Sequence, residues 1–457
     1  MRSRAEELIY KYFIDKFWKK RESFIGVEIE MPVINLKKQP VQPEFWKALV
    51  DLLAGRFNFR PVKFTLEGFP IEAVNENQDT FSFETTFNTI ELAMGKKRSL
   101  NEIVRSFYKY LGAIMKLAQE HNHLVCGMGI NPYMQYADSK PLNTPSMLAK
   151  SEFLKKFTTH HDGEIFHAFS AATQTHLDPT LPLLPVLLNL LGRLAFVDGI
   201  LFANSPLFPL DINSERMAHL PPGLRAKLAS PNLCFRDILW SECEAPNTKA
   251  YDGHYGCIED IVNHLLDLKL FVVSDGLDGF KPIQPVKFAG YFAGSGHSEK
   301  DLACFRSLEP VAVSKHGTIE IRRTCTQPLA EIFVPPAFYL GIAENYRKAI
   351  EVTDDFWRES RITISNSELR RRAVFQEMIA PPEKMRLFIS SLVAISLEGL
   401  KKRNFGEEKY LGRLNNGDDF MESPARKQLR LLQEGWEYQE VILAYSRWGE
   451  PENPKSP

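Results

Sequence analysis

The sequence has no excess of charge of either sign, and it has no long apolar run free of prolines and charges. Its 56 Lys and Arg residues nearly balance its 57 Asp and Glu residues, so the net charge of −1 does not favour nucleic acid or anionic lipid. The most apolar stretch, residues 181–207, contains Pro182, Pro185, Arg193 and Asp198. These residues favour a buried helix followed by a turn over a membrane span. We therefore expect neither a nucleic-acid partner nor a membrane partner.

Paired cysteines and the common catalytic signatures are also missing. The six cysteines are scattered and include no CxxC pair, which is typical of reduced thiols in a cytoplasmic protein. The segment MRSRAEELIYKYFIDKFW is charged and amphipathic and has no secretory pattern. No P-loop, Rossmann fingerprint, GxSxG, HExxH or kinase signature occurs. The sequence therefore predicts a cytoplasmic protein outside the enzyme classes that these motifs identify.

The composition predicts a globular body with a large core. Hydrophobic residues make up 44% of the chain and include 32 phenylalanines, and no internal repeat or linker divides it. We expect a catalytic domain over residues 1–355 and a helical C-terminal region over residues 356–457. The polar, proline-rich tail GEPENPKSP of this region is expected to be disordered.

Hydrophobic periodicity predicts an alternation of strands and helices. Strands are expected at 24–33 (ending near Pro32), 62–73, 80–92, 124–130 and 168–177, with a strand pair over 311–322 that is broken at Lys315-His316-Gly317. Helices are expected at 3–20, 43–55, 99–121 and 185–203, and through most of the chain from 336 to 448.

Two acidic residues in the first predicted strand, GVEIE, are the first candidates for chemistry. In a strand, Glu28 and Glu30 point to the same face, roughly 7 Å apart, while Ile25, Val27 and Ile29 occupy the other face. One interpretation is the solvated outer face of an edge strand, which would carry no function. The other is a functional acidic surface, and this choice depends on further acids lying nearby.

Further isolated acids do occur in apolar strand sequence. Glu84 and Glu91 stand in FSFETTFNTIEL, and Glu320 stands in GTIEIR with Arg322 on the same side of the strand. Carboxylates that are buried together repel one another unless cations neutralise them. Oxygen-rich groups of this kind suit Mg²⁺ or Mn²⁺ together with a polyphosphate. His176, in ATQTHLD, would add a nitrogen ligand, although a single histidine in a strand is more often a core residue.

Six segments occur in the order and approximate spacing found in the glutamate–cysteine ligase superfamily: GVEIEMPVIN, FSFETTFNTIELA, VCGMGINP, ATQTHLD, LFANSPL and GTIEIRRTCTQP. They lie within residues 22–335, about two-thirds of the chain. The sequence resembles most closely the family 2 branch, which contains plant-like and bacterial carboxylate–amine ligases. This resemblance implies an α+β protein with a glutamine synthetase-like catalytic core, in which a curled antiparallel sheet holds metals and ATP.

The resemblance also implies roles for individual residues. The implied metal ligands are Glu28, Glu30, Glu84, Glu91, His176 and Glu320, and the implied catalytic residues are Glu320 and Arg322. Arg322 is expected to contact the transferring phosphate. Arg236, in CFRDILW, is expected to hold a substrate carboxylate, and Gln174 and Arg322 complete the expected substrate-binding set.

The implied reaction is ATP-dependent synthesis of γ-glutamylcysteine from glutamate and cysteine through an acyl phosphate, with Mg²⁺ or Mn²⁺. Two departures from the family pattern concern the expected amino acid pocket. NTIEL lacks the usual proline and glycines, and Arg-Thr-Cys-Thr follows Arg322 in place of Gly-Ala-Asp. The amine acceptor therefore stays open, and an acid and amine other than glutamate and cysteine are an alternative. A guanidino-type phosphotransferase and a non-catalytic binding protein are further alternatives. The sequence makes no prediction of oligomeric state.

Overall fold

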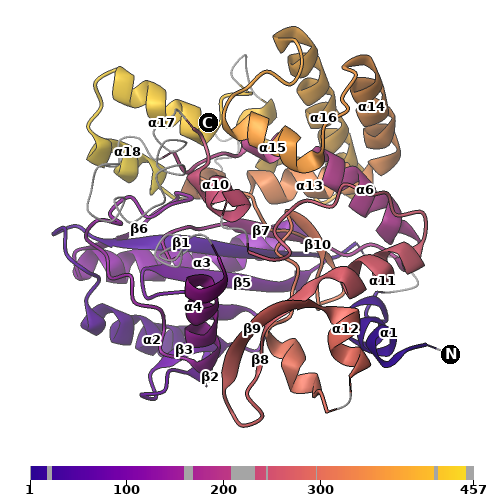
Figure 1. Cartoon of the computed structure of the whole chain (residues 1–457). Helices are drawn as coiled ribbons and strands as arrows, with labels where there is room; N and C mark the ends of the chain where they lie inside the picture. Colours follow the sequence, from indigo (N-terminus) through magenta and orange to yellow (C-terminus); the bar gives the residue numbers. More distant parts are fainter. Residues whose placement is uncertain are drawn as a thin grey trace.

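A computed structural model describes residues 2–17, 23–158, 168–206, 232–242, 245–294, 296–415 and 420–448, without the side chains of residues 241 and 242. Within these residues the chain combines helices with an antiparallel sheet, as expected for an α+β protein (Figure 1). The tail at 449–457, expected to be disordered, lies outside the described residues. In the described part of the chain, no helix is both long and apolar enough to cross a membrane.

Nine strands of the described residues form one large sheet in the order β10-β11-β7-β1-β5-β4-β3-β2, with β6 paired to β1. All of these neighbours are antiparallel. The strands are β1 (Ile25–Asn35), β2 (Arg60–Phe64), β3 (Pro70–Val74), β4 (Thr80–Phe83), β5 (Thr89–Lys97), β6 (His123–Val125), β7 (Thr173–Leu177), β10 (Val311–Val313) and β11 (Ile319–Ile321). A separate hairpin contains β8 (Lys269–Ser274) and β9 (Phe280–Lys287).

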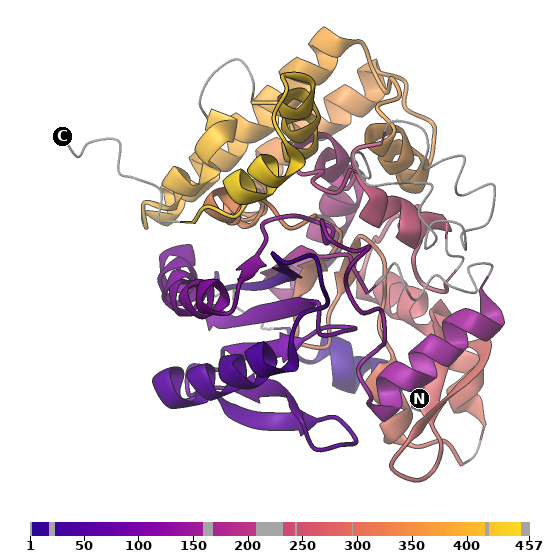
Figure 2. The ribbon, with the colours of Figure 1, turned by 90° about the vertical axis from the view of Figure 1, so that its left-hand side faces the viewer.

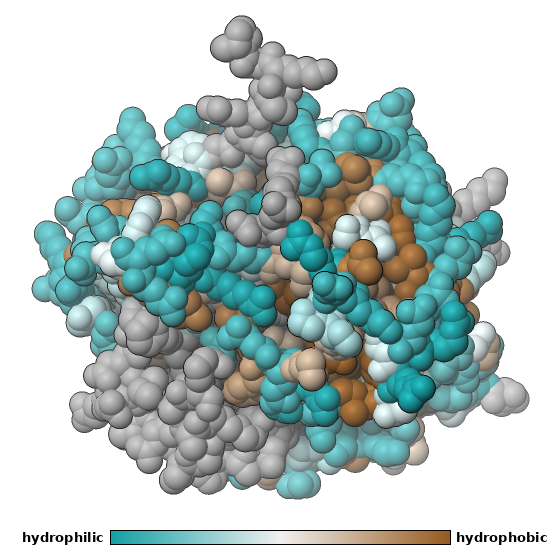
Figure 3. All heavy atoms as spheres, turned by 90° about the horizontal axis from the view of Figure 1, so that it is seen from above, coloured by the Kyte–Doolittle hydropathy of each residue, from teal (hydrophilic) through white to brown (hydrophobic). Residues whose placement is uncertain are grey.

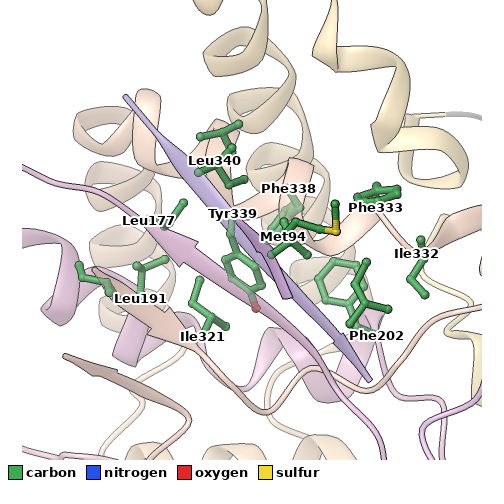
Figure 4. Packing of buried hydrophobic residues seen from close by; sticks show 14 of the residues in the cluster. Met94, Leu177, Leu191, Phe202, Ile321, Ile332, Phe333, Phe338, Tyr339 and Leu340 are labelled. Atoms are coloured by element: carbon green, nitrogen blue, oxygen red, sulfur yellow. The ribbon is translucent and has the colours of Figure 1, made fainter. Parts of the chain in front are cut away.

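One face of the large sheet is apolar and belongs to the core. The alternation in β1 places Ile25, Val27 and Ile29 on this face, and all three are fully buried. Figure 4 shows Leu177 of β7, Ile321 of β11 and Met94 of β5 packed with apolar side chains of α13 (Val334–Glu344). The polar residues of β1, β5, β7 and β11 therefore lie on the opposite face of the sheet.

Helices cover the sheet and complete the chain. In Figure 1 the C-terminal helices lie above the large sheet, and the β8–β9 hairpin lies below it with α12. The helices before α13 are α1 (Arg4–Ile9), α2 (Pro43–Phe57), α3 (Leu100–Glu120), α4 (Pro145–Phe157), α6 (Leu184–Leu194), α7 (Val197–Leu201), α10 (Phe235–Glu242), α11 (Ile258–Asp267) and α12 (Phe288–Ala293). Those after it are α14 (Tyr346–Glu359), α15 (Asn366–Val374), α16 (Pro382–Arg403), α17 (Pro424–Gln433) and α18 (Tyr438–Tyr445).

The short helical turns are of 3-10 or π type. They are η1 (Tyr10–Ile14), η2 (Leu181–Leu183), η3 (Glu299–Cys304), η4 (Leu329–Glu331) and η5 (Glu407–Asn415). Seen from above, the surface is mostly hydrophilic, with apolar side chains gathered in a limited area (Figure 3). Figure 2 shows the C-terminal helices as a layer over the sheet from the side. The predicted division of the chain at residue 355 stays a prediction, and α14 spans that position.

Three predicted strands differ from the structure in ways that matter for the site. The strands expected at 62–73 and 80–92 are each two strands, because turns at 65–69 and 84–88 reverse the chain. Glu84 therefore lies in a turn after β4, not on a strand. The first strand passes Pro32 and ends at Asn35, since the missing N–H of Pro32 is tolerated in its pairing with Thr89.

Candidate active site

Strand β1 lies in the middle of the large sheet, so Glu28 and Glu30 do not lie on a solvated edge strand. Glu28 stands opposite Gln174 of β7 on one side, and Glu30 stands opposite Glu91 of β5 on the other. Directly paired residues of antiparallel strands point to the same face. The sheet register therefore gathers acids from β1 and β5 on one half-buried surface, and the edge-strand interpretation is wrong.

Among the described residues, two groups could each hold a cation. Glu28, His176 and Glu320 form the first group, and Glu30, Glu84 and Glu91 form the second group. Within each group, the potential ligand atoms all lie within 4.8 Å of one another. The structure thus brings together all six residues that were expected as metal ligands, divided between two neighbouring groups. Their role as ligands stays a prediction.

The first group is built around His176. Its Nε2 atom lies 3.1 Å from Oε1 of Glu28, and its Nδ1 atom lies 2.9 Å from the hydroxyl of Thr318, which in turn contacts Ser314 at 2.7 Å. Gly26 pairs with His176 across the sheet, and a Cβ at that glycine would stand 3.3 Å from the His176 Cβ. The glycine of GVEIE therefore leaves room for the imidazole, and the hydroxyls orient the ring.

Charges in the first group compensate one another. Burial disfavours ionisation of Glu28, but the adjacent His176 outweighs it and lowers the pKa of Glu28 to about 2. Burial also disfavours the charged form of His176, but the facing carboxylate of Glu28 outweighs burial and raises the pKa of His176 above its usual value. Arg322 Nη1 also donates a hydrogen bond to Glu320. This group is therefore close to neutral without any added cation.

The second group is compensated only in part, since Arg236 acts on Glu30, and Arg306 and Lys150 act on Glu84. Glu30 accepts hydrogen bonds at Oε2 from the Ala172 N–H at 2.7 Å and at Oε1 from Gln174 Nε2 at 3.0 Å. Ser82 donates to Glu91 at 3.2 Å. These donors orient the carboxylates but carry no charge. Gln174 thus positions Glu30, and its expected contact with substrate stays a prediction.

The pKa values of the second group show that burial and the mutual repulsion of its carboxylates outweigh these cations. Burial, with Glu84 nearby, raises the pKa of Glu30 to about 8. Burial likewise raises the pKa of Glu84, and burial together with the other carboxylates raises the pKa of Glu91 well above its usual value. A bound divalent cation would relieve this repulsion, and carboxylate oxygens are the ligands that Mg²⁺ and Mn²⁺ prefer. The second group fits such an ion well.

Two arginines lie beside these groups. Arg322 directly follows β11, and Arg236 near the start of α10 donates from Nη2 to the Arg322 carbonyl at 3.2 Å. Arg236 is 6% exposed, and its Nε and Nη1 atoms have no hydrogen-bond partner among the described residues. A buried guanidinium with free donors is suited to an anionic ligand, because it binds a carboxylate through two parallel hydrogen bonds.

A cavity of about 190 Å³ connects the arginines with the second group. Its wall includes Glu30, Glu84, Arg236 and Arg322 together with Lys150, Arg306 and a set of apolar side chains. Burial, with Arg306 nearby, lowers the pKa of Lys150 to about 7. Titratable groups with strongly perturbed pKa values around one cavity are typical of functional sites.

Sequence reasoning missed two cationic residues of this cavity, Lys150 and Arg306. Lys150 stands in MLAKSEFL on α4, where it looks like an ordinary surface lysine, and Arg306 lies in a loop after η3. Neither has a local sequence signal. Their positions depend on contacts between distant segments.

The residues after Arg322 that depart from the family pattern do not line the cavity. Arg323 is buried and pairs with Asp237, and Thr324 donates to Asp198 at 3.1 Å. The Sγ atom of Cys325 lies 3.2 Å from that of Cys234. These residues therefore belong to the packing behind the cavity, whereas Thr89 of the other departure, NTIEL, lines it.

No family model and no curated protein matches the sequence. The glutamate–cysteine ligase of Francisella tularensis, solved in complex with AMP, is 11% identical to this chain with a TM-score of 0.47, and the match covers 94% of this chain and 89% of that one. A bifunctional glutathione synthetase from Pasteurella multocida is 10% identical with a TM-score of 0.47, and the match covers 97% of this chain. This chain spans 53% of the length of that synthetase. Similarities this weak do not assign a fold family or an activity.

Proposed function

We propose that this protein is an ATP- and divalent-metal-dependent carboxylate–amine ligase that acts on the γ-carboxylate of glutamate. The acceptor is cysteine, as the sequence resemblance implies, or another amine. The observation that carries the proposal is the pair of acidic groups next to Arg236, Arg322 and one cavity. A glutamine synthetase-like core and a cytoplasmic location belong to the same proposal.

The two groups would hold the metal ions. Glu30, Glu84 and Glu91 fit one ion, and Glu28, His176 and Glu320 fit another after His176 gives up its contact with Glu28. When bound, such ions supply neutralisation of the phosphate charge and orientation of the phosphates. The glutamates thus serve as ligands, and their burial keeps them preorganised.

The proposed chemistry has two balanced steps. The glutamate γ-carboxylate attacks the γ-phosphorus of ATP, so that an acyl phosphate and ADP form. The amine then attacks the acyl carbon, loses a proton and expels phosphate, so that an amide forms. Arg322, which lies between Glu320 and the cavity, stabilises the negative charge of the transferring phosphoryl group. Arg236 donates a hydrogen bond to a substrate carboxylate from its free Nε or Nη1 atom.

The test is incubation with ATP, Mg²⁺, glutamate and a panel of amines, with ADP and amide measured by mass spectrometry. We expect ADP, phosphate and amide in equal amounts, and no turnover when EDTA replaces Mg²⁺. A stable phosphorylated product without amide would support a guanidino-type phosphotransferase instead. Absence of metal-dependent ATP binding in calorimetry would support a non-catalytic binding protein.

A further inference from the structure

The cavity has a charged end and an apolar wall. Met147, Leu154, Trp240 and Phe271 belong to the apolar wall. Cationic side chains from α4, the loop after η3, α10 and the end of β11 line the charged end: Lys150, Arg306, Arg236 and Arg322. Apolar surroundings strengthen the attraction between such cations and a bound anion. Two of the four, Lys150 and Arg306, have no role in the reaction described so far.

Lys150 lies on the face of α4 that lines the cavity. Met147, three residues before it, and Leu154, four residues after it, line the same cavity, as expected for one face of a helix. Phe153 holds this helix against β8, since its ring centroid lies 4.6 Å from that of Phe271. The position of Lys150 at the cavity therefore follows from the packing of α4 and not from a flexible surface segment.

Arg306 lies on a loop that Asn247 holds in place. The Nδ2 atom of Asn247 donates hydrogen bonds to the carbonyl of Arg306 at 3.3 Å and to the carbonyl of Lys269 at 2.9 Å. The backbone carbonyl of Asn247 accepts a hydrogen bond from the N–H of Leu308 at 2.9 Å. These contacts tie the loop after η3 to the start of β8, so the backbone that carries Arg306 is supported on both sides of this residue.

Lys150 and Arg306 repel one another and have no ion-pair partner among the described residues. Burial, together with the charge of Arg306, lowers the pKa of Lys150. In the described part of the chain, neither side chain makes a hydrogen bond or an ion pair. Both charges act on Glu84, which places them on the side of the cavity next to the second group. An anion bound between the two cations would relieve their repulsion.

A divalent cation at the second group would require an anion at the same place. Mg²⁺ takes only part of its ligands from protein carboxylates and the rest from water and substrate phosphates. The second group borders the cavity through Glu30 and Glu84, so a further ligand of that ion would lie in the cavity with Lys150 and Arg306. A polyphosphate chain has several adjacent charged oxygens for the ion and both cations, whereas a carboxylate has only two.

We propose that Lys150 and Arg306 bind the polyphosphate chain of the nucleotide substrate in this cavity, next to the second group. This inference rests on the proposed ligase function and adds two nucleotide-binding residues that the sequence resemblance does not supply. Arg322 is then left for the transferring phosphoryl group and Arg236 for a substrate carboxylate. After the transfer, Lys150 and Arg306 hold the charge of the leaving ADP, so they act in the first chemical step and not in amide formation.

Calorimetry in the presence of Mg²⁺ tests the inference with inorganic tripolyphosphate, the β,γ-imido analogue of ATP and glutamate. Lys150→Met keeps the length of the side chain without its charge, and Arg306→Gln removes the guanidinium group. Each variant should bind tripolyphosphate and the analogue about 10- to 100-fold more weakly, because a hydrogen bond between charged groups is lost. The affinity for glutamate should be unchanged. Arg306→Lys, which keeps the positive charge, should lose less affinity than Arg306→Gln.

Lys156→Gln is the matched control, because Lys156 also lies on α4, has a side chain that is 58% exposed and does not line the cavity. It should bind all three probes as the wild type does. Lys150→Met should be at least as stable as the wild type, since it removes a partly buried charge that has no ion-pair partner among the described residues. Urea unfolding therefore separates a loss of binding from a loss of folding.

An unchanged affinity for tripolyphosphate in both variants would overturn this inference, and so would a wild-type protein that does not bind tripolyphosphate. A loss of affinity for glutamate alone would assign the two cations to a carboxylate and would overturn it as well. Formation of ADP and amide by the wild type would show that the ligase function stands in these cases. If the wild type binds tripolyphosphate through Lys150 and Arg306 but forms no amide with any amine, the proposed function fails and the polyphosphate site stands.

Discussion

Arg370 Nε donates to Asp237 Oδ1 at 2.7 Å and thereby joins helix α15 of the C-terminal region to helix α10, which carries Arg236. The same guanidinium reaches Asp198 at 3.1 Å and the carbonyl of Arg323 at 3.2 Å. Burial by itself would lower the pKa of Arg370, but the carboxylates of Asp237 and Asp198 outweigh burial and raise this pKa. The C-terminal helices therefore contribute a buried cation that supports the segments on which Arg236 and Arg322 lie.

Replacing Arg370 should lower both the stability of the protein and its affinity for the carboxylate substrate. Arg370→Gln leaves Asp237 and Asp198 buried with less positive charge, so we expect the free energy of unfolding to fall by about 3–5 kcal/mol. The KM for the carboxylate substrate should rise because α10 loses an anchor. The urea midpoint and steady-state kinetics measure both effects. Arg358→Gln is the control, since its side chain is 72% exposed and exposed pairs contribute about 0–1 kcal/mol. Equal stability of the two variants would contradict this role for Arg370.

The second acidic group predicts a pH-dependent metal affinity. Burial, with neighbouring carboxylates, raises the pKa of Glu30 from 4.5 to about 8 and raises those of Glu84 and Glu91. The folded protein therefore binds these protons more tightly than the unfolded chain. The stabilisation that these protonated carboxyl groups contribute to the free energy of unfolding is present below pH 4.5 and is lost as pH rises towards 8.

Mg²⁺ must displace these protons, so its affinity should increase between about pH 6 and pH 8 with release of protons. Calorimetry in buffers of different ionisation heat measures the number released, and melting curves in EDTA and in Mg²⁺ measure the stabilisation. The pKa of Glu28 is lowered to about 2, so its contribution is lost only in acid and does not change over this window. A Mg²⁺ affinity that is constant from pH 6 to pH 8 would exclude this group as the binding site.

Glu91→Gln should separate stability from activity. The change removes a buried carboxyl whose ionisation its neighbours oppose, so the metal-free protein should be at least as stable as the wild type at pH 8. Turnover should fall by roughly two orders of magnitude because a metal ligand is lost. Glu320→Gln should cause a similar loss of turnover for the same reason.

Glu72→Gln is the matched control for these two variants. Glu72 pairs with Ser82 and so points to the same face of the sheet as Glu91, but it belongs to neither acidic group. ADP release measures turnover in all three variants, and circular dichroism measures their folding. Near-normal ADP release from Glu91→Gln would remove this residue from the metal site.

Arg322→Lys should lower kcat about 100-fold with a smaller change in KM, because an ammonium group cannot reproduce the planar fork of donors around the transferring phosphate. Single-turnover formation of acyl phosphate, trapped with hydroxylamine, shows whether the loss lies in the first chemical step. An unchanged kcat would show that Arg322 does not contact the transferring group.

The close packing behind the site can be tested by replacing glycines with alanine. A Cβ at Gly129 would lie 2.8 Å from the Cβ of Cys325 and 3.1 Å from the carbonyl of Asn204. Gly129→Ala should therefore reduce the free energy of unfolding by about 1–3 kcal/mol. Gly192 in α6 has no atom within 4 Å of such a Cβ, so Gly192→Ala should increase stability by about 0.5–1 kcal/mol. Chemical unfolding of both variants measures the difference, and a stable Gly129→Ala variant would contradict the tight contact.

The local sequence pattern predicted a residue's position correctly where that position depends only on the residue's own segment. The alternation of GVEIE predicted that Glu28 and Glu30 share a face, and the strand pair around Lys315-His316-Gly317 was predicted at the correct place. Pattern failed at Glu84, because the turn after Phe83 depends on pairing between β4 and β5. It also gave no indication of Lys150 or Arg306, whose neighbours in the cavity are distant in sequence.

The sequence by itself determined that Glu28 and Glu30 share one face of their strand, because strand periodicity and the burial of apolar neighbours act locally. Only the tertiary structure decided how the six residues divide into two groups, since β7 lies between β1 and β11 in the sheet although it is far from both along the chain. The same holds for the pKa values, which depend on burial and on charges from other segments. The cavity between α4, α10 and β8, with its charged end and its apolar wall, exists only once these distant segments have packed together.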